Sequence, residues 1–135
     1  MKIIVCLDDK NGMLFGGRRQ SMDRILRQEA LALAGEKPLW MNGYSAGQFG
    51  QEGNIAVDEN FLANAPEDAW CFVENADLMP YLEKITQVAV YRWNRHYPST
   101  TWFPMDHFAG KWQIVSQREF AGSSHDTITE EVYAV

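Results

Sequence analysis

The stretch from Lys84 to Trp112 constrains the fold more than any other part of the sequence. It contains a run of β-branched and aromatic residues at 88–93, which suits a strand with at least one buried face. We predict a strand over 85–94 and a short aromatic segment over 100–103, which Pro104 ends. The sequence before this stretch alternates between strand and helix patterns, whereas the sequence after it has the pattern of a hairpin. The stretch therefore marks the change from an α/β to an antiparallel arrangement.

The hydrophobic pattern of the remaining sequence predicts a regular series of elements. Between them, residues 13–20 are expected to be a flexible loop, and Ser21 is expected to cap the first long helix. The strands are expected at 2–7, 38–42, 54–57, 69–73, 111–120 and 128–135, and the helices at 22–34, 44–49, 58–65 and 76–84.

Strands that are separated by helices pair in parallel, with the helices lying on the faces of the sheet. The expected fold class is therefore α/β, with a mixed, mostly parallel sheet, flanking helices and a C-terminal antiparallel hairpin. A chain of 135 residues is long enough for one domain spanning 1–135. Sheets of this kind bind ligands beyond the carboxyl ends of their strands.

Composition and charge argue against several classes of partner. The formal net charge is −6, which disfavours nucleic acid and anionic membranes. We interpret the four arginines at 18, 19, 24 and 27 as the solvated face and approach of a helix. Cys6 and Cys71 are expected to be buried free thiols, and no signal peptide or membrane-length apolar run is present. We therefore expect a cytoplasmic protein.

The common catalytic and metal-binding motifs are absent. The three histidines, His96, His107 and His125, are scattered, and neither paired cysteines nor a zinc-binding helix motif accompanies them. No metal is therefore expected. The sequence also lacks a nucleophile elbow, a phosphate-binding loop and a dinucleotide-binding glycine motif.

Several short motifs occur in an order that resembles the dihydrofolate reductase family over nearly the whole chain. They are the strand at 2–7 with Asp8-Asp9-Lys10-Asn11-Gly12-Met13, Asp23 at a helix start, Lys37-Pro38-Leu39-Trp40-Met41 with Asn42-Gly43-Tyr44-Ser45, Thr101-Trp102-Phe103-Pro104 followed by Trp112, and Ser124-His125. The resemblance implies the fold of that family and a cleft for a pterin-like ligand.

The resemblance also implies roles for individual residues. Asp23 would be the catalytic acid that contacts the ligand, and Thr101 would support Asp23 in that role. Ser45 would contact cofactor phosphate. Phe15, Leu26 and Cys6 would line the ligand site.

The residues themselves leave simpler interpretations open. A buried Asp23 beside an apolar helix face would have a raised pKa and could donate a proton, or it could be an ordinary residue of the first helical turn. Ser45 could likewise be an ordinary hydroxyl at a helix start. We expect Trp93, Trp102 and Trp112 to lie in the core rather than to stack on a ligand.

Four departures from the family pattern bear on the cofactor. The Trp-Pro pair of the family's active-site loop is missing from residues 13–22, and Gly43 stands where the family has an arginine. Glu74-Asn75 replaces the Gly-Gly pair that lets the backbone approach the cofactor. The chain is also shorter than the family between residues 57 and 69. Conventional NADP binding is therefore not expected.

Three hypotheses follow for the function. The first is a divergent dihydrofolate reductase-like protein that lacks NADPH-dependent reductase activity and binds a small planar ligand or a protein partner. The second is a working NAD(P)H-dependent reductase of a pterin or related heterocycle, with Asp23 as its acid or anchor. The third is a structural module that forms homo-oligomers through edge strands and exposed aromatic residues.

Overall fold

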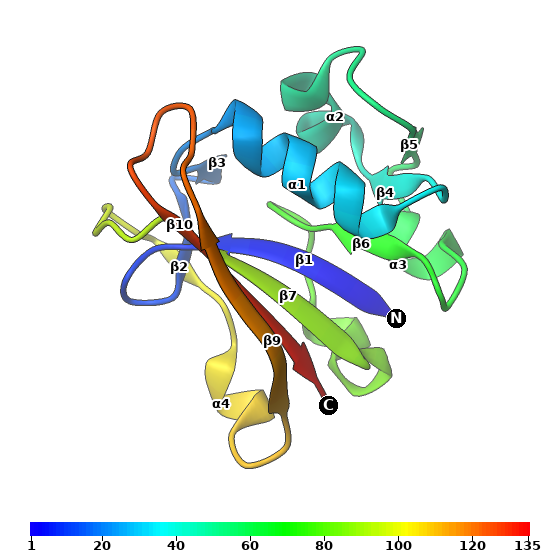
Figure 1. Cartoon of the computed structure of the whole chain (residues 1–135). Coiled ribbons are helices and arrows are strands. Elements are labelled where there is room, and N and C mark those ends of the chain that lie inside the picture. Colours follow the sequence, from blue (N-terminus) through cyan, green and yellow to red (C-terminus); the bar gives the residue numbers. More distant parts are fainter.

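The computed structural model describes all residues from 1 to 135. A seven-stranded sheet in the order β5-β4-β6-β1-β7-β10-β9 forms its centre (Figure 1). All neighbours from β5 to β7 are parallel, whereas β10 is antiparallel to both β7 and β9. This confirms the predicted mixed sheet with a C-terminal antiparallel hairpin. The strands are β1 (Lys2–Leu7), β4 (Leu39–Met41), β5 (Ile55–Val57), β6 (Trp70–Phe72), β7 (Gln87–Arg92), β9 (Gln113–Phe120) and β10 (Ile128–Ala134).

A second, three-stranded sheet was not predicted. It has the order β3-β2-β8, where β2 is Gly12–Phe15, β3 is Arg18–Arg19 and β8 is Thr101–Trp102. Strands β2 and β3 form a hairpin over residues 12–19, which covers most of the segment 13–20 that the sequence suggested to be a flexible loop. Gly16 and Gly17 make the turn with positive φ values of 59° and 77°, a conformation that other residues rarely adopt. The Gly-Gly pair is thus a tight hairpin turn.

The helices differ from prediction mainly at their ends. They are α1 (Arg24–Ala34), α2 (Gly43–Phe49), α3 (Phe61–Asn64), the 3₁₀ helix η1 (Met79–Lys84) and α4 (Met105–Phe108). The N-cap of α1 is Asp23 rather than Ser21, because the Asp23 carboxylate accepts the free N–H groups of Ile25 and Leu26. The region 76–84 forms a 3₁₀ helix from Met79 onward, with Pro80 near its start, and α4 had no clear sequence signal.

The large sheet separates two hydrophobic layers. Strand β1 is buried on both faces, so Ile3 and Val5 point to one layer and Ile4 to the other. Helices α1 and α2 cover one face (Figure 1), where Leu26 and Phe49 pack. The small sheet, α3, η1 and α4 cover the other face.

The stretch from Lys84 to Trp112 supplies a central strand and an aromatic stack. Phe103, Phe108 and Trp112 lie nearly parallel, with Phe108 and Trp112 centroids 4.8 Å apart, and Tyr133 of β10 stacks on Trp112 at 4.2 Å. The expectation of a core position is met by Trp93, which is 4% exposed. It is wrong for Trp102, because β8 is short and turns that side chain outward, where it is 55% exposed.

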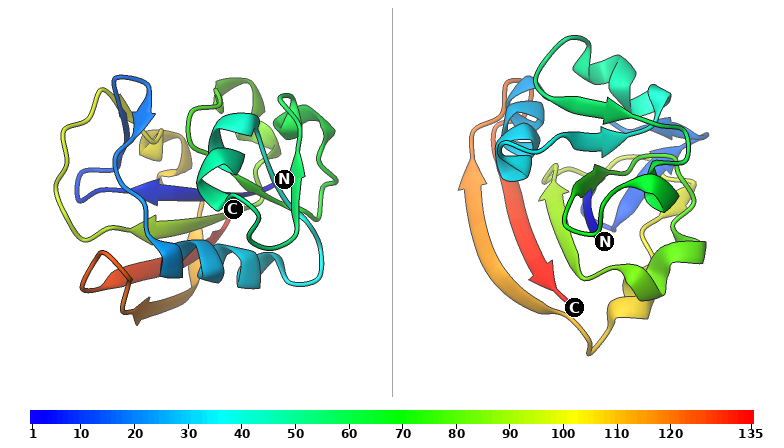
Figure 2. Two further views of the ribbon diagram at one scale, coloured as in Figure 1. Left: turned by 90° about the horizontal axis from the view of Figure 1, so that it is seen from above. Right: turned by 90° about the vertical axis from the view of Figure 1, so that its right-hand side faces the viewer.

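Strand β9 forms one edge of the large sheet (Figure 2). Seven of its eight residues are exposed, including the apolar Ile114 and Val115. None of the helices has the length and apolar character that a membrane span requires.

Candidate functional site

The place predicted to bind a ligand, beyond the carboxyl ends of β1 and β6, is nearly filled. A cavity of only about 10 Å³ remains there, room for about one water molecule. It is lined by Cys6, Met13, Arg19, Gln20, Ser21, Val73, Glu74 and Trp93. Burial, together with the nearby Glu74 carboxylate, raises the pKa of the Cys6 thiol well above its usual value, so the thiol stays protonated.

Arg19, Glu74 and Tyr44 close this region. The Arg19 guanidinium forms a two-point ion pair with the Glu74 carboxylate, at 2.9 Å from Nε and 3.1 Å from Nη2. The same guanidinium donates to the backbone oxygen of Tyr44 at 3.0 Å and lies 4.2 Å from the centre of the Tyr44 ring. The Glu74 carboxylate is buried, and the Arg19 guanidinium balances its charge. The position where the resemblance expects a Gly-Gly backbone thus holds a partly buried ion pair.

The start of α2, where the resemblance expects a phosphate, is occupied by a carboxylate. The N–H of Gly43 donates to Glu59 Oε2 at 2.7 Å. Asn42 caps the helix by accepting the Ser45 N–H, and its amide donates to Asn75 Oδ1 at 2.9 Å. The Ser45 hydroxyl, predicted to contact cofactor phosphate, is fully buried and has no hydrogen-bond partner. Ser45 therefore faces the protein interior in this arrangement.

Asp23 joins the start of α1 to the connection between β9 and β10. Besides Ile25 and Leu26, its carboxylate accepts the backbone N–H groups of Ser123 at 3.0 Å and Ser124 at 2.9 Å. His125 Nδ1 lies 3.0 Å from Asp23 Oδ2, and the Asp23 side chain is fully buried. These contacts place Asp23 away from solvent.

The expectation of a raised pKa for Asp23 is wrong. Burial alone would raise this pKa, but the hydrogen bonds from Ser123, Ser124, His125 and Leu26 outweigh burial and lower it well below the usual value. The sequence indicates that Asp23 is buried, but it does not show which hydrogen-bond donors surround the carboxylate. An ionised carboxylate with such a low pKa is a poor proton donor at neutral pH.

Thr101 and Phe15 are not brought together with Asp23. Thr101 pairs with Leu14 of β2 and is exposed, and Phe15 is 54% exposed. Leu26 is 1% exposed and packs in the core beneath α1. Of the residues expected to line a ligand site, only Cys6 reaches the small cavity.

Thr101 instead lines an open cleft of about 300 Å³ between the small sheet and the segment before η1. Its walls include Leu14, Trp102 and Met79, of which Trp102 and Met79 are 55% and 65% exposed. Its only ionisable lining residues are Glu74 and Asp77. The volume is at the lower end of the range of roughly 300 to 1,000 Å³ for small-molecule sites. Sequence reasoning gave no role to Arg19 or Asp77, since neither stands in a motif, and it used His125 only as part of the Ser124-His125 motif.

The two most buried aspartates make the protein sensitive to acid. Asp8, fully buried, accepts N–H groups of Lys10, Gly12 and Tyr97; burial would raise its pKa, but these bonds lower it. A folded-state pKa below the unfolded value gives stability that is present above about pH 4 and is lost as pH falls through the folded pKa. We expect the melting temperature to be flat from pH 7 to 5 and to fall steeply below about pH 4. Thermal unfolding across that range measures this, and a melting temperature unchanged at pH 3 would contradict it.

The geometry defines a doubly wound α/β protein in which side chains leave a small cavity beside Cys6 and an open cleft beside Thr101. No family model matches the chain, and no curated protein matches it. A solved structure of dihydrofolate reductase from Enterococcus faecalis, complexed with NADP(H) and RAB-propyl, is similar to it with a TM-score of 0.67 and 10% sequence identity. The match covers 98% of this chain and 94% of that chain. The chain thus has a dihydrofolate reductase-like fold, as the sequence motifs suggested.

Proposed function

We propose that this chain is a small-ligand-binding protein of dihydrofolate reductase-like fold that has no NADPH-dependent reductase activity. The observation that carries the proposal is the partly buried ion pair of Arg19 and Glu74. A nicotinamide held beside this backbone would have to displace a two-point ion pair and leave the buried Glu74 carboxylate without its partner, which is unfavourable.

The start of α2, where the resemblance expects cofactor phosphate, also supports the proposal. Glu59 accepts the Gly43 N–H at the start of α2, which would otherwise be available to a phosphate. A phosphate would have to replace this carboxylate and would be repelled by it. Two carboxylates therefore oppose a dinucleotide at two separate points.

The open cleft that contains Thr101 and Trp102 is the ligand site that we propose. The exposed Trp102 indole offers a flat face of the kind on which planar ligands stack. Asp77 and Asn75 add polar groups at the edge of the cleft. A planar ligand with an apolar face and a few hydrogen-bonding groups fits these walls.

One alternative is a working reductase, which the likeness to an NADP(H)-bound dihydrofolate reductase favours. It requires Arg19 to swing out so that a nicotinamide can enter. Incubating the protein with NADPH and dihydrofolate, and following NADPH absorbance, separates the two proposals. We expect no turnover above the rate without protein, whereas turnover above that rate that rises with protein concentration would favour the reductase.

A second alternative is a homo-oligomer, which the exposed edge strand β9 favours. Unpaired backbone groups and the exposed Ile114 and Val115 could pair with a second copy. Light scattering after size exclusion tests it, since a mass of about 15.5 kDa at all concentrations corresponds to the monomer.

The cleft can be tested without knowing the natural ligand. In a screen of planar fragments followed by NMR, we expect shifted amide signals to cluster at residues 74–79 and 101–104. Trp102→Ala should weaken binding of any such fragment about 10-fold or more, because stacking on an aromatic ring contributes roughly 1 to 2 kcal/mol. Phe15→Ala, which also removes an exposed aromatic residue but lies outside the cleft, is the matched control. Equal losses in both variants would contradict the assignment of the cleft.

A further inference from the structure

A chain of hydrogen bonds at the start of α1 joins an acid, an imidazole and a hydroxyl. Asp23 Oδ2 lies 3.0 Å from His125 Nδ1, and His125 Nε2 lies 3.1 Å from Ser21 Oγ. Nucleophilic hydrolases use this sequence of groups, in which a base takes the hydroxyl proton and an acid orients the base. The arrangement is independent of the cleft and of the function proposed above.

The hydrogen-bonding partners determine which group donates and which accepts along this series of hydrogen bonds. Asp23 is ionised and can only accept, so it takes the hydrogen bond from His125 Nδ1–H. In the neutral imidazole this leaves Nε2 unprotonated, and Nε2 can accept the proton of the Ser21 hydroxyl. Trp93 stacks on the imidazole at 4.6 Å and holds the plane of the ring. The hydrogen bond to Asp23 and the stacking on Trp93 together hold the His125 imidazole in one orientation.

A residue that lines the same cavity as Ser21 carries a buried donor without a partner. The indole Nε1–H of Trp93 is buried and makes no hydrogen bond, although a buried N–H normally finds an acceptor. Trp93, which is 4% exposed, lines the same small cavity as Ser21. The Tyr97 hydroxyl lies 3.0 Å from His125 Nε2 and shares that nitrogen with the Ser21 hydroxyl. A free N–H donor such as that of Trp93 stabilises the oxyanion that forms when a hydroxyl attacks a carbonyl.

The size of the cavity limits the substrate. Its volume of about 10 Å³ admits one water molecule or a methyl-sized group. The apolar side chains of Met13 and Val73 are part of its wall. Ser21 is itself partly exposed, and Met22 and Ser124 beside it are exposed, so the rest of a substrate can remain in solvent.

We propose that Ser21, His125 and Asp23 form a hydrolytic site for esters of very short acyl groups, with Trp93 Nε1 as the oxyanion donor. Ser21 Oγ bonds to the carbonyl carbon while its proton passes to His125 Nε2. The carbon–oxygen bond to the alcohol then breaks, and the alcohol leaves with the proton from Nε2. Water attacks the acyl group on Ser21 with His125 again as base, which releases the carboxylic acid and restores the hydroxyl.

The first test is covalent labelling of the intact protein. A fluorophosphonate probe should add to the wild-type chain once, and peptide mass spectrometry should place the adduct on Ser21. With p-nitrophenyl acetate the protein should release nitrophenol faster than with p-nitrophenyl butyrate, by about 10-fold or more, because the longer chain does not fit the cavity. An unlabelled wild-type protein, or a label on another residue, overturns the proposal.

Single-residue variants distinguish a loss of ester hydrolysis from a loss of folding stability. Ser21→Ala should abolish labelling and lower ester hydrolysis by about 100-fold or more, with an unchanged melting curve. Ser116→Ala, which removes an exposed hydroxyl on β9, is the control and should keep both. Trp93→Phe keeps the stacked ring and should lower kcat by about 10-fold or more while the label stays on Ser21. Hydrolysis that survives in Ser21→Ala overturns the proposal.

Discussion

Replacing Asp23 by asparagine is expected to lower the free energy of unfolding by about 3 kcal/mol, the scale for removing one partner of a buried charged network. The isosteric amide keeps one acceptor oxygen but turns an NH₂ group toward donors that now use the carboxylate. The affected donors are the N–H groups of Ser123 and Ser124, which tie the β9–β10 connection to α1, and Nδ1 of His125. For a chain of this length the melting temperature should fall by about 10 °C.

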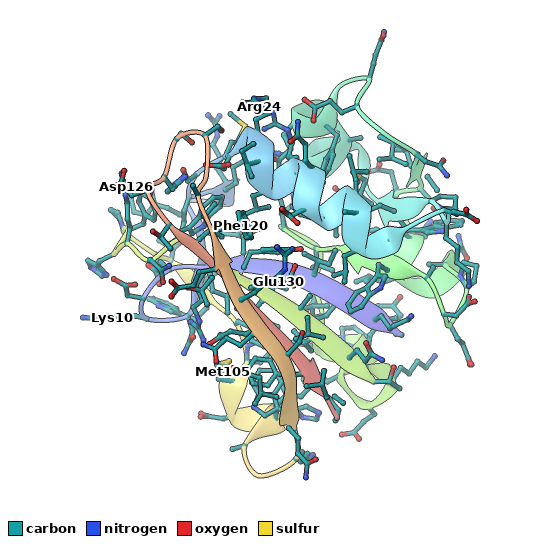
Figure 3. The ribbon with its side chains drawn as sticks, viewed as in Figure 1. Lys10, Arg24, Met105, Phe120, Asp126 and Glu130 are labelled. Atoms are coloured by element: carbon teal, nitrogen blue, oxygen red, sulfur yellow. The ribbon has the colours of Figure 1, made fainter.

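The control for Asp23→Asn is Asp126→Asn in the same connection (Figure 3). Asp126 is exposed, so its variant should change stability by less than about 0.5 kcal/mol. Urea unfolding followed by circular dichroism measures both variants. Similar stability of the two variants would contradict the view that Asp23 fastens the end of the chain to the first helix.

Replacing Phe108 by alanine is expected to lower the free energy of unfolding by about 4 kcal/mol, since it removes a buried ring from the aromatic cluster. Phe108 is fully buried, and its ring centroid lies 5.6 Å from that of Phe103 and 4.8 Å from that of Trp112. Removing the ring leaves a cavity under the small sheet and takes away two aromatic contacts. The same unfolding measurement tests this variant.

Two further variants show whether volume is responsible for the loss in Phe108→Ala. Phe108→Leu keeps most of the volume and should lose clearly less than the alanine variant. Val115→Ala on the exposed strand β9 should lose less than about 0.5 kcal/mol. If the alanine and leucine variants at position 108 lose the same stability, packing of the stack is not the cause.

The order of elements could be predicted because local pattern and global fold agree. Strand β7 was expected from its β-branched and aromatic run, and β1 from its continuous apolar residues, which are buried on both faces. The motif around Phe103 and Pro104 suggested the fold that the comparison with a solved dihydrofolate reductase supports.

The small sheet and the helix ends could not be predicted, because they depend on contacts made far along the chain. Strand β2 is supported by β8, nearly ninety residues away, and this pairing leaves Trp102 outside the core. The N-cap of α1 is Asp23 rather than Ser21 because the hairpin near Ser123 surrounds the carboxylate with donors. A sequence pattern shows which residues are apolar, but it does not show which donors meet a buried oxygen.

The candidate site was only partly predictable for the same reason. The replacement of the family's glycine pair by Glu74-Asn75 is visible in the sequence and argues against conventional NADP binding. Its partner Arg19 lies fifty-five residues earlier, within a segment expected to be a loop. The ion pair that fills the site therefore became visible only in the fold.

Titration of the protein with NADPH, followed by nucleotide fluorescence, tests the central claim most directly. The Enterococcus faecalis dihydrofolate reductase, whose structure contains NADP(H), serves as the positive control under the same conditions. The Glu74 and Glu59 carboxylates occupy the two ends of the expected nucleotide site. We therefore predict no saturable change in nucleotide fluorescence up to about 1 mM NADPH. Saturable binding of one NADPH per chain with a micromolar dissociation constant would contradict the account.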